Sequence, residues 1–162
     1  MFKIDIHTHI LPENLNEVTD TFSDPRFLRM DIIDDKTAML KKDGAAFRKV
    51  DCNCWNHQKR IQDCHTTKVD VQVLSTIPVL FSYWAKDDEG LTLSKFLNNH
   101  IAEVVRDEPN RFIGLGTVPL QNPNMAITEM DRIVNELKFH GIEIGSNVNG
   151  ENLSKEKFHP IF

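Results

Sequence analysis

Apolar and polar residues alternate along residues 3–10, which is the pattern of a half-buried β-strand. Because side chains of a strand point to opposite faces with period two, Asp5, His7 and His9 share one face and the intervening residues share the other. Two imidazoles one pleat apart can reach a single metal ion, and the strand ends in a loop, where α/β barrels place their active sites. The spacing therefore favours a metal site at His7 and His9 over two solvated or hydrogen-bonded polar side chains.

The remaining chain alternates between strand and helix patterns. The expected strands are 69–75, 111–118 and 141–145, and the expected helices are 56–67, 91–106 and 124–137, with a further helix start at 154–162. This order predicts a parallel α/β sheet, either open and doubly wound or one half of an eight-stranded barrel. No Gly-x-Gly-x-x-Gly loop follows the first strand, which weakens the dinucleotide-binding version of the open sheet.

A β-rich segment without helical periodicity separates the first strand from the first expected helix. Strands are expected at 27–33, 37–41 and 46–50, and Asp43-Gly44 lies between the last two. An Asp-Gly pair between half-apolar runs is a strong hairpin signal. We therefore expect a small β insertion at about 14–55, on the face where barrels acquire specificity through their loops.

Composition limits the classes of function. The chain has 162 residues, 40% of them hydrophobic and 27% charged, which suits one compact domain. A formal net charge of -5 and the lack of a basic run favour neither a nucleic-acid partner nor an anionic membrane. No apolar stretch approaches the roughly 20 residues of a membrane span, and the first ten residues do not read as a secretory signal.

Three cysteines, an odd number, argue against a disulfide framework and for the reducing cytosol. Cys52, Cys54 and Cys64 lie near His57 and His65 in the sequence. This spacing is unusual for a zinc finger, so free thiols and surface histidines are the preferred interpretation over a structural zinc site.

The Asp5-x-His7-x-His9 strand resembles the amidohydrolase superfamily of metal-dependent barrels. The stretches 41–48, 53–55, 71–85, 112–119 and 141–145 resemble, within it, the 2-amino-3-carboxymuconate-6-semialdehyde decarboxylases. The resemblance covers nearly the whole chain but only the first half of those enzymes. It implies that residues 1–162 are the N-terminal half of a metal-dependent-hydrolase-type TIM (β/α)8 barrel domain, with a small β insertion after strand 1.

The resemblance also implies an activity. It is the zinc-dependent, non-oxidative decarboxylation of 2-amino-3-carboxymuconate 6-semialdehyde in the kynurenine route of tryptophan catabolism, which limits quinolinate formation. His7 and His9 correspond to zinc ligands and Arg48 to a substrate-binding arginine, with the remaining ligands and the acid/base groups expected beyond Phe162. The family forms cytosolic homodimers. By itself the present chain is expected to bind zinc weakly and to be inactive.

Two other functions and several residues stay open. The chain could belong to a metal-dependent hydrolase of a cyclic amide or lactone, or be a non-catalytic truncated form. Asp5 either orients an imidazole or is solvated or paired, and the aromatic loop 81–84 either lines the pocket or packs in the core. Glu143 is ambiguous as a lone carboxylate in a strand. The helix after Trp55 ends in His65-Thr66-Thr67-Lys68, where the family usually has a glycine before the second strand.

Overall fold

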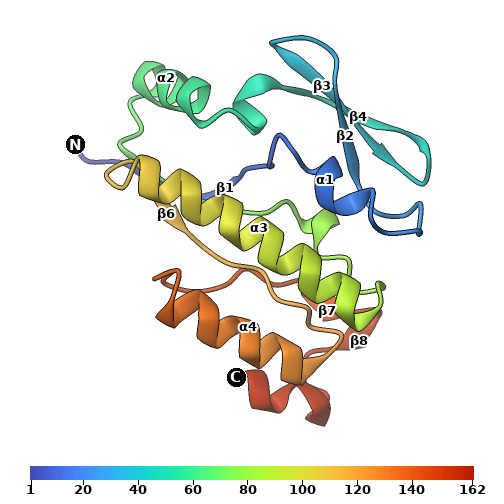
Figure 1. The fold of residues 1–162 in the computed structure, drawn as a ribbon. Coiled ribbons are helices and arrows are strands. Elements are labelled where there is room, and N and C mark those ends of the chain that lie inside the picture. Colours follow the sequence, from blue (N-terminus) through green and yellow to red (C-terminus); the bar gives the residue numbers. More distant parts are fainter.

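The computed structural model describes residues 1–162 and is built around a three-stranded parallel sheet in the order β1-β5-β6 (Figure 1). Its strands are β1 (Ile4–His9), β5 (Val71–Ser75) and β6 (Phe112–Gly114). Parallel neighbours need long crossovers. Helix α2 (His57–Thr67) lies in the first crossover and α3 (Asp87–Asp107) in the second, as the alternating pattern predicts.

The expected fourth strand is reduced to one parallel bridge between Gly116 and Ile142, and the expected third strand is regular only as far as Gly114. Two backbone hydrogen bonds, from the Gly116 N–H and to the Gly116 carbonyl, hold the later segment. With no further strand beyond it, the segment pairs along one side only. The sequence was therefore right about the position of this element and wrong about its regularity.

Close packing explains the glycines in this part of the sheet. A Cβ on Gly114 would lie 2.6 Å from a ring carbon of Phe139, and a Cβ on Gly116 would lie 2.5 Å from the Cδ1 atom of Ile133. Both neighbours are buried side chains that come from α4 (Pro123–Asn135) and the loop after it. The glycines thus let this helix and loop close directly over the sheet.

A second sheet is antiparallel and occupies the segment between β1 and α2. It consists of β2 (Arg29–Ile32), β3 (Thr37–Lys42) and β4 (Ala45–Asp51), in sequence order. Asp43 and Gly44 both have positive φ, 55° and 74°, as the two-residue turn of a hairpin requires. The three predicted strands and the hairpin are confirmed, but the segment also contains one unexpected helical turn, α1 (Asn16–Thr19). Four residues are too few to show a helical period.

The remaining helices differ from expectation mainly at their ends. Helix α3 begins four residues earlier than expected, with three acidic residues in a first turn whose backbone N–H groups favour negative charge. The chain end forms a 3-10 helix, η3 (Glu156–Ile161), in place of the expected α-helix start. The short elements are η1 (Cys52–Cys54), η2 (Pro78–Leu80), β7 (Asn147–Val148) and β8 (Glu151–Asn152).

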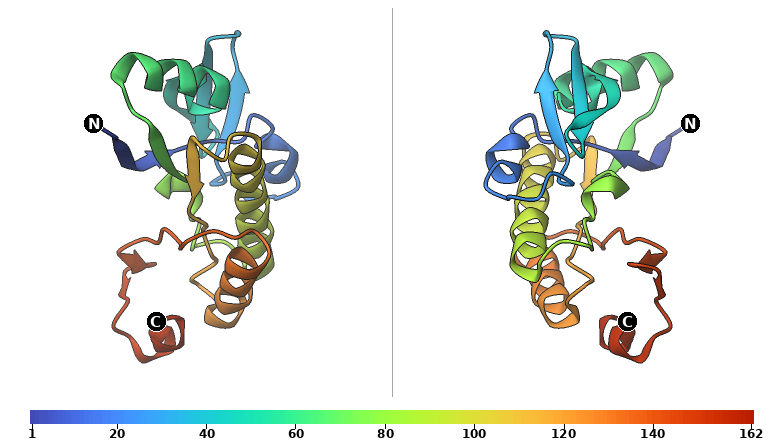
Figure 2. Two further views of the ribbon diagram at one scale, coloured as in Figure 1. Left: turned by 90° about the vertical axis from the view of Figure 1, so that its left-hand side faces the viewer. Right: turned by 90° about the vertical axis from the view of Figure 1, so that its right-hand side faces the viewer.

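Helices α3 and α4 lie side by side along one face of the parallel sheet (Figure 2). A buried polar network joins them. The Asn98 side chain donates to the Glu129 carboxylate and to the Thr117 carbonyl, and it accepts from the Thr117 N–H. Arg132 completes the network through two hydrogen bonds to Glu129, which is fully buried. Every charge in this network is paired, as a buried carboxylate requires.

Helix α2 is capped at its start and strained at its end. The Asn56 side chain accepts hydrogen bonds from the N–H groups of Gln58 and Lys59. Lys68 ends the helix in the left-handed conformation, with φ 58° and ψ 41°. A residue with a Cβ pays about 1 kcal/mol or more for this conformation, which glycine adopts freely.

Replacing Lys68 by glycine should therefore raise the free energy of unfolding by about 1 kcal/mol, measured by urea denaturation. Lys68→Ala is the matched control, because alanine removes the charged side chain but keeps the Cβ. An equal gain in both variants would trace the effect to the lysine charge and contradict the conformational explanation.

Candidate functional site

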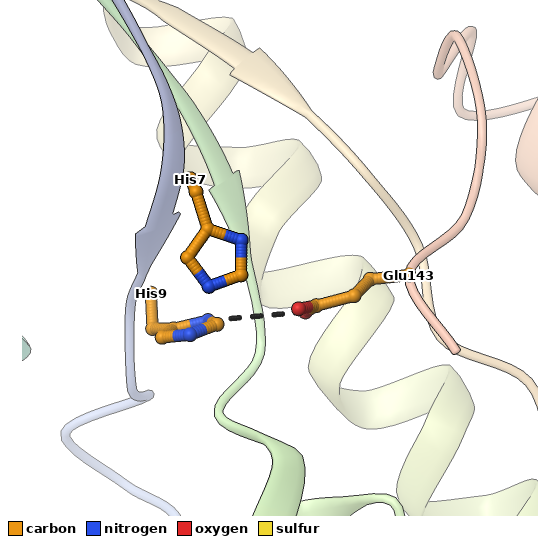
Figure 3. Close-up of side chains that lie close together, drawn as sticks. All are labelled: His7, His9 and Glu143. Atoms are coloured by element: carbon orange, nitrogen blue, oxygen red, sulfur yellow. Dashed lines mark ion pairs between the residues drawn. The ribbon is translucent and has the colours of Figure 1, made fainter. Parts of the chain in front are cut away.

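The carboxyl ends of the parallel strands bring together three side chains of the types that can bind a metal ion. His7 and His9 lie at the end of β1, and Glu143 follows the bridge that continues the sheet beyond β6. One ligand atom from each of the three lies within 4.8 Å of the others. Figure 3 shows both rings and the carboxylate directed toward one another, with the ring centroids of the histidines 4.8 Å apart.

A register shift in β1 separates Asp5 from this group. Asp5 pairs with Gln72, Thr8 pairs with Leu74, and the shift lies between Asp5 and Thr8. The Asp5 carboxylate instead accepts a 3.5 Å hydrogen bond from the Gln72 side chain and lines a separate cavity beside Arg60. Of the two roles considered for Asp5, the structure supports the paired carboxylate and not the partner of an imidazole.

Ser75, which the sequence did not single out, is the residue that orients His9. Its hydroxyl donates to the Thr8 carbonyl at 3.2 Å and lies 3.1 Å from Nδ1 of His9. Because the Ser75 hydroxyl donates its proton to the Thr8 carbonyl, its oxygen can only accept from His9. This hydrogen-bond pattern assigns the ring proton to Nδ1 and the unprotonated lone pair to Nε2. Burial lowers the pKa of His9 below its usual value, and the nearby Glu143 carboxylate opposes that shift. His9 is thus held neutral, the form that binds metals.

Glu143 is the residue of the group whose role the sequence left ambiguous. Its Oε2 atom is shielded from solvent, has no hydrogen-bond partner and lies 3.8 Å from Nδ1 of His9. A buried carboxylate oxygen without a donor is costly, and a cation would remove that cost. The only signal in the sequence was a charged residue between two apolar ones, Ile142 and Ile144, in an expected strand.

The donor set fits a divalent metal ion. Two imidazoles and one carboxylate form a known ligand set of catalytic zinc sites, in which a fourth position remains for water or substrate. The two histidines come from one strand and Glu143 from a distant segment, so the set depends on the tertiary fold. Glu143 forms no ion pair with an arginine or a lysine, and the titratable side chain that approaches its carboxylate is His9.

Arg60 on α2 holds the end of β1 in place through hydrogen bonds to the backbone. Its Nη2 donates to the His9 carbonyl at 2.5 Å and its Nε donates to the Asn53 carbonyl at 3.1 Å. Burial lowers the pKa of its guanidinium, and the nearby Asp5 and Asp63 carboxylates oppose that shift. Arg60 therefore ties α2, η1 and the C-terminal end of β1, which carries His9, into one unit.

A cavity of about 540 Å³ opens beside the two histidines. His7 and His9 line it together with Phe47 and Arg48 of β4 and an apolar floor that includes Leu40. Arg48, the predicted substrate-binding residue, thus faces the same cavity as the histidines, although it is 40 residues away from them in the sequence. The antiparallel sheet supplies this wall of the cavity.

The aromatic loop after β5 contributes both to the core and to a second cavity. Phe81 and Tyr83 are buried and stacked, with ring centroids 5.5 Å apart. The Tyr83 hydroxyl accepts a hydrogen bond from the Gly145 N–H, and burial raises the pKa of Tyr83 to about 12. Trp84 packs against Phe27. These residues also border a second cavity that reaches Glu143, whereas none of them lines the cavity beside the histidines.

The three cysteines are free thiols, as expected. Cys64 is buried, whereas Cys52 and Cys54 are partly buried. Burial raises the pKa of the Cys54 and Cys64 thiols, which keeps them protonated and unreactive.

Comparison with known proteins places this site in a family. The sequence matches the family described as "Amidohydrolase" over residues 4–162. The chain belongs to the amidohydrolase family. Among curated amidohydrolase relatives, it is 46% identical to 2-amino-3-carboxymuconate-6-semialdehyde decarboxylase of Dictyostelium discoideum and 33% identical to the protein of that name from Caenorhabditis elegans. Each match covers 99% of this chain and 45% of the relative.

The amidohydrolase fold is also found in solved structures. The crystal structure of 5-carboxyvanillate decarboxylase from Novosphingobium aromaticivorans, complexed with manganese, superposes with a TM-score of 0.74. It is 23% identical, and the match covers 99% of this chain and 46% of that one. The chain thus spans about half the length of the relatives that it matches. None of its helices is both long and apolar enough to cross a bilayer.

Arg60→Lys should lower the free energy of unfolding by about 2 kcal/mol, because a lysine ammonium cannot bond the His9 and Asn53 carbonyls simultaneously. Urea denaturation measures the change. Arg106→Lys, at an exposed position in the last turn of α3, should stay within about 0.5 kcal/mol. A similar small effect at both positions would contradict the bridging role of Arg60.

Proposed function

We propose that this chain is the N-terminal half of a zinc-dependent decarboxylase acting on 2-amino-3-carboxymuconate 6-semialdehyde. The observation that carries the proposal is the pairing of His7 and His9 at a strand end, at the edge of a cavity that Arg48 also lines. The 46% identity to the Dictyostelium relative over nearly the whole chain supports the choice of substrate. The reaction belongs to tryptophan breakdown through kynurenine and limits the formation of quinolinate.

His7 and His9 would hold the metal ion in this proposal. Bound there, zinc would supply a Lewis acid that lowers the pKa of a coordinated water. Imidazole suits zinc, although manganese accompanies the related 5-carboxyvanillate decarboxylase. The protein's own contribution is to fix the ligands in place, which Ser75 does for the His9 ring and Arg60 for the His9 backbone.

Arg48 would bind a carboxylate of the substrate. A guanidinium forms two parallel hydrogen bonds to a carboxylate, which fixes both the position and the orientation of the molecule. Phe47 and Leu40 supply apolar surface beside it for the unsaturated carbon chain. The substrate would therefore lie between the cation of Arg48 and the metal ligands of β1.

Residues 1–162 would form half of a (β/α)8 barrel domain, with the β-rich segment 14–55 as an insertion at the active face. Two observations support this arrangement. The chain spans 45% of its curated relatives, and Ile4 and Ile6 on the edge strand β1 are 49% and 75% exposed. The whole enzyme would be a cytosolic homodimer. The present chain alone would not turn over substrate, because acid/base groups and the second half of the pocket would be absent.

A chimaera tests the proposed activity. Residues 1–162 would replace the matching half of the Dictyostelium relative, and release of carbon dioxide from 2-amino-3-carboxymuconate 6-semialdehyde would be measured. We expect turnover by the chimaera and none by residues 1–162 alone. In the chimaera, Arg48→Ala should raise KM about 10- to 100-fold with unchanged metal content, as expected for the loss of a charged hydrogen-bonded pair.

Lys49→Ala is the control, since Lys49 is the adjacent cation on β4 and does not line the cavity. A folded, zinc-loaded chimaera that releases no carbon dioxide would contradict the decarboxylase proposal. Hydrolysis of a cyclic amide or lactone by the same chimaera would favour the hydrolase alternative. Equal kinetics for Arg48→Ala and Lys49→Ala would remove Arg48 from the substrate site.

A further inference from the structure

We propose that Glu143 is a third protein ligand of the metal ion, so that residues 1–162 hold a divalent cation without help from any other segment. The inference rests on the proposed metal site at His7 and His9 and extends it to a residue far away in the sequence. It replaces the expectation, drawn from the sequence, that every further ligand lies beyond Phe162.

One oxygen of the partly buried Glu143 carboxylate has no polar partner. The Oε2 atom is shielded from solvent and accepts no hydrogen bond, and its ion-pair contact is the 3.8 Å approach to the His9 ring. Glu129, which is fully buried, is instead paired with Asn98 and Arg132. A carboxylate kept unpaired at the end of a parallel sheet, facing two imidazoles, is best explained by a cation between them.

The backbone around Glu143 is fixed on both sides. Its N–H donates to the Gly116 carbonyl at 2.8 Å, and two residues later the Gly145 N–H donates to the Tyr83 hydroxyl at 3.1 Å. A Cβ on Gly145 would lie 3.1 Å from the Tyr83 ring, so the loop is packed tightly against the core. The carboxylate is therefore presented from a rigid position, as a ligand should be.

The distances suit one ion after small side-chain rotations. Two ligands of a tetrahedral zinc ion, each about 2.1 Å from the metal, lie about 3.4 Å apart. One ligand atom from each of the three residues lies within 4.8 Å of the others, and Oε2 of Glu143 is 3.8 Å from Nδ1 of His9. The Ser75 hydroxyl also lies against Nδ1, so the His9 ring must turn to offer Nε2 to the ion. The glutamate side chain, unrestrained by hydrogen bonds, can close the remaining gap.

Titration of the purified chain with Zn²⁺ alone, followed calorimetrically, tests the assignment. We expect one ion per chain, and an affinity at least about 100-fold lower in Glu143→Gln, since even outer partners of metal ligands account for about 10- to 100-fold. His7→Ala and His9→Ala should show losses at least as large. Glu103→Gln, which removes the same charge at an exposed position of α3, should bind as the unchanged chain does.

Cobalt(II) distinguishes a ligand from a residue that only orients His9. Loss of a ligand changes the visible absorption of the bound ion, whereas a loosened imidazole weakens binding and leaves that spectrum alone. Without metal, Glu143→Gln should melt no lower than the unchanged chain, because the carboxylate has no partner to lose. This melting temperature shows that the variant is folded.

The outcomes separate the two proposals. The Glu143 assignment would be overturned if the Zn²⁺ affinity of Glu143→Gln lay within about 10-fold of that of the unchanged chain, or if its cobalt spectrum were unchanged. The assignment of His7 and His9 would then remain. Binding unaffected by His7→Ala and His9→Ala would overturn both metal assignments. No binding by the unchanged chain would overturn the three-ligand site, whereas the decarboxylase proposal would still be decided by the chimaera.

Discussion

The parallel pairing of β1, β5 and β6 is the constraint on which the rest of this structure depends. In a parallel sheet all strands finish at the same edge, so the polar residues at their ends must meet. His9 is directly opposite Ser75, and the bridge at Gly116 carries the same geometry one segment further, to Glu143. The meeting of Glu143 with the two histidines is therefore a consequence of strand direction, because these residues are far apart in the sequence.

The elements around this edge of the sheet supply the other residues of the site. Helix α2 provides Arg60, whose guanidinium satisfies the His9 carbonyl where β1 leaves the sheet. The antiparallel sheet provides Arg48 and an aromatic neighbour, Phe47, as one wall of the cavity. The C-terminal segment provides Glu143. Its backbone is held two residues later, where the Gly145 N–H donates a hydrogen bond to the Tyr83 hydroxyl. A polar site is thereby built on a rigid, largely apolar base.

Most of the fold could be predicted from local patterns. Hydrophobic periodicity located α2, α3 and α4, and the Asp43-Gly44 turn located the hairpin, because these features depend on residues close together in the chain. The predicted elements were wrong where the local sequence signal is weak or fits more than one kind of structure. A one-turn helix shows no period, the acidic start of α3 reads as a loop, and the segment 141–145 is a strand by composition but has only one neighbour to pair with.

The candidate site, like the fold, could be predicted only in part from the sequence. The sequence by itself determined that His7 and His9 could meet, since period two places them on one face, and a family resemblance pointed to Arg48. Only the tertiary structure decided that Asp5 turns away at a register shift and that Ser75 and Glu143 converge on His9. The reason is physical: spacing within one strand is fixed by backbone geometry, whereas contacts between strands depend on pairing, register and packing across the whole chain.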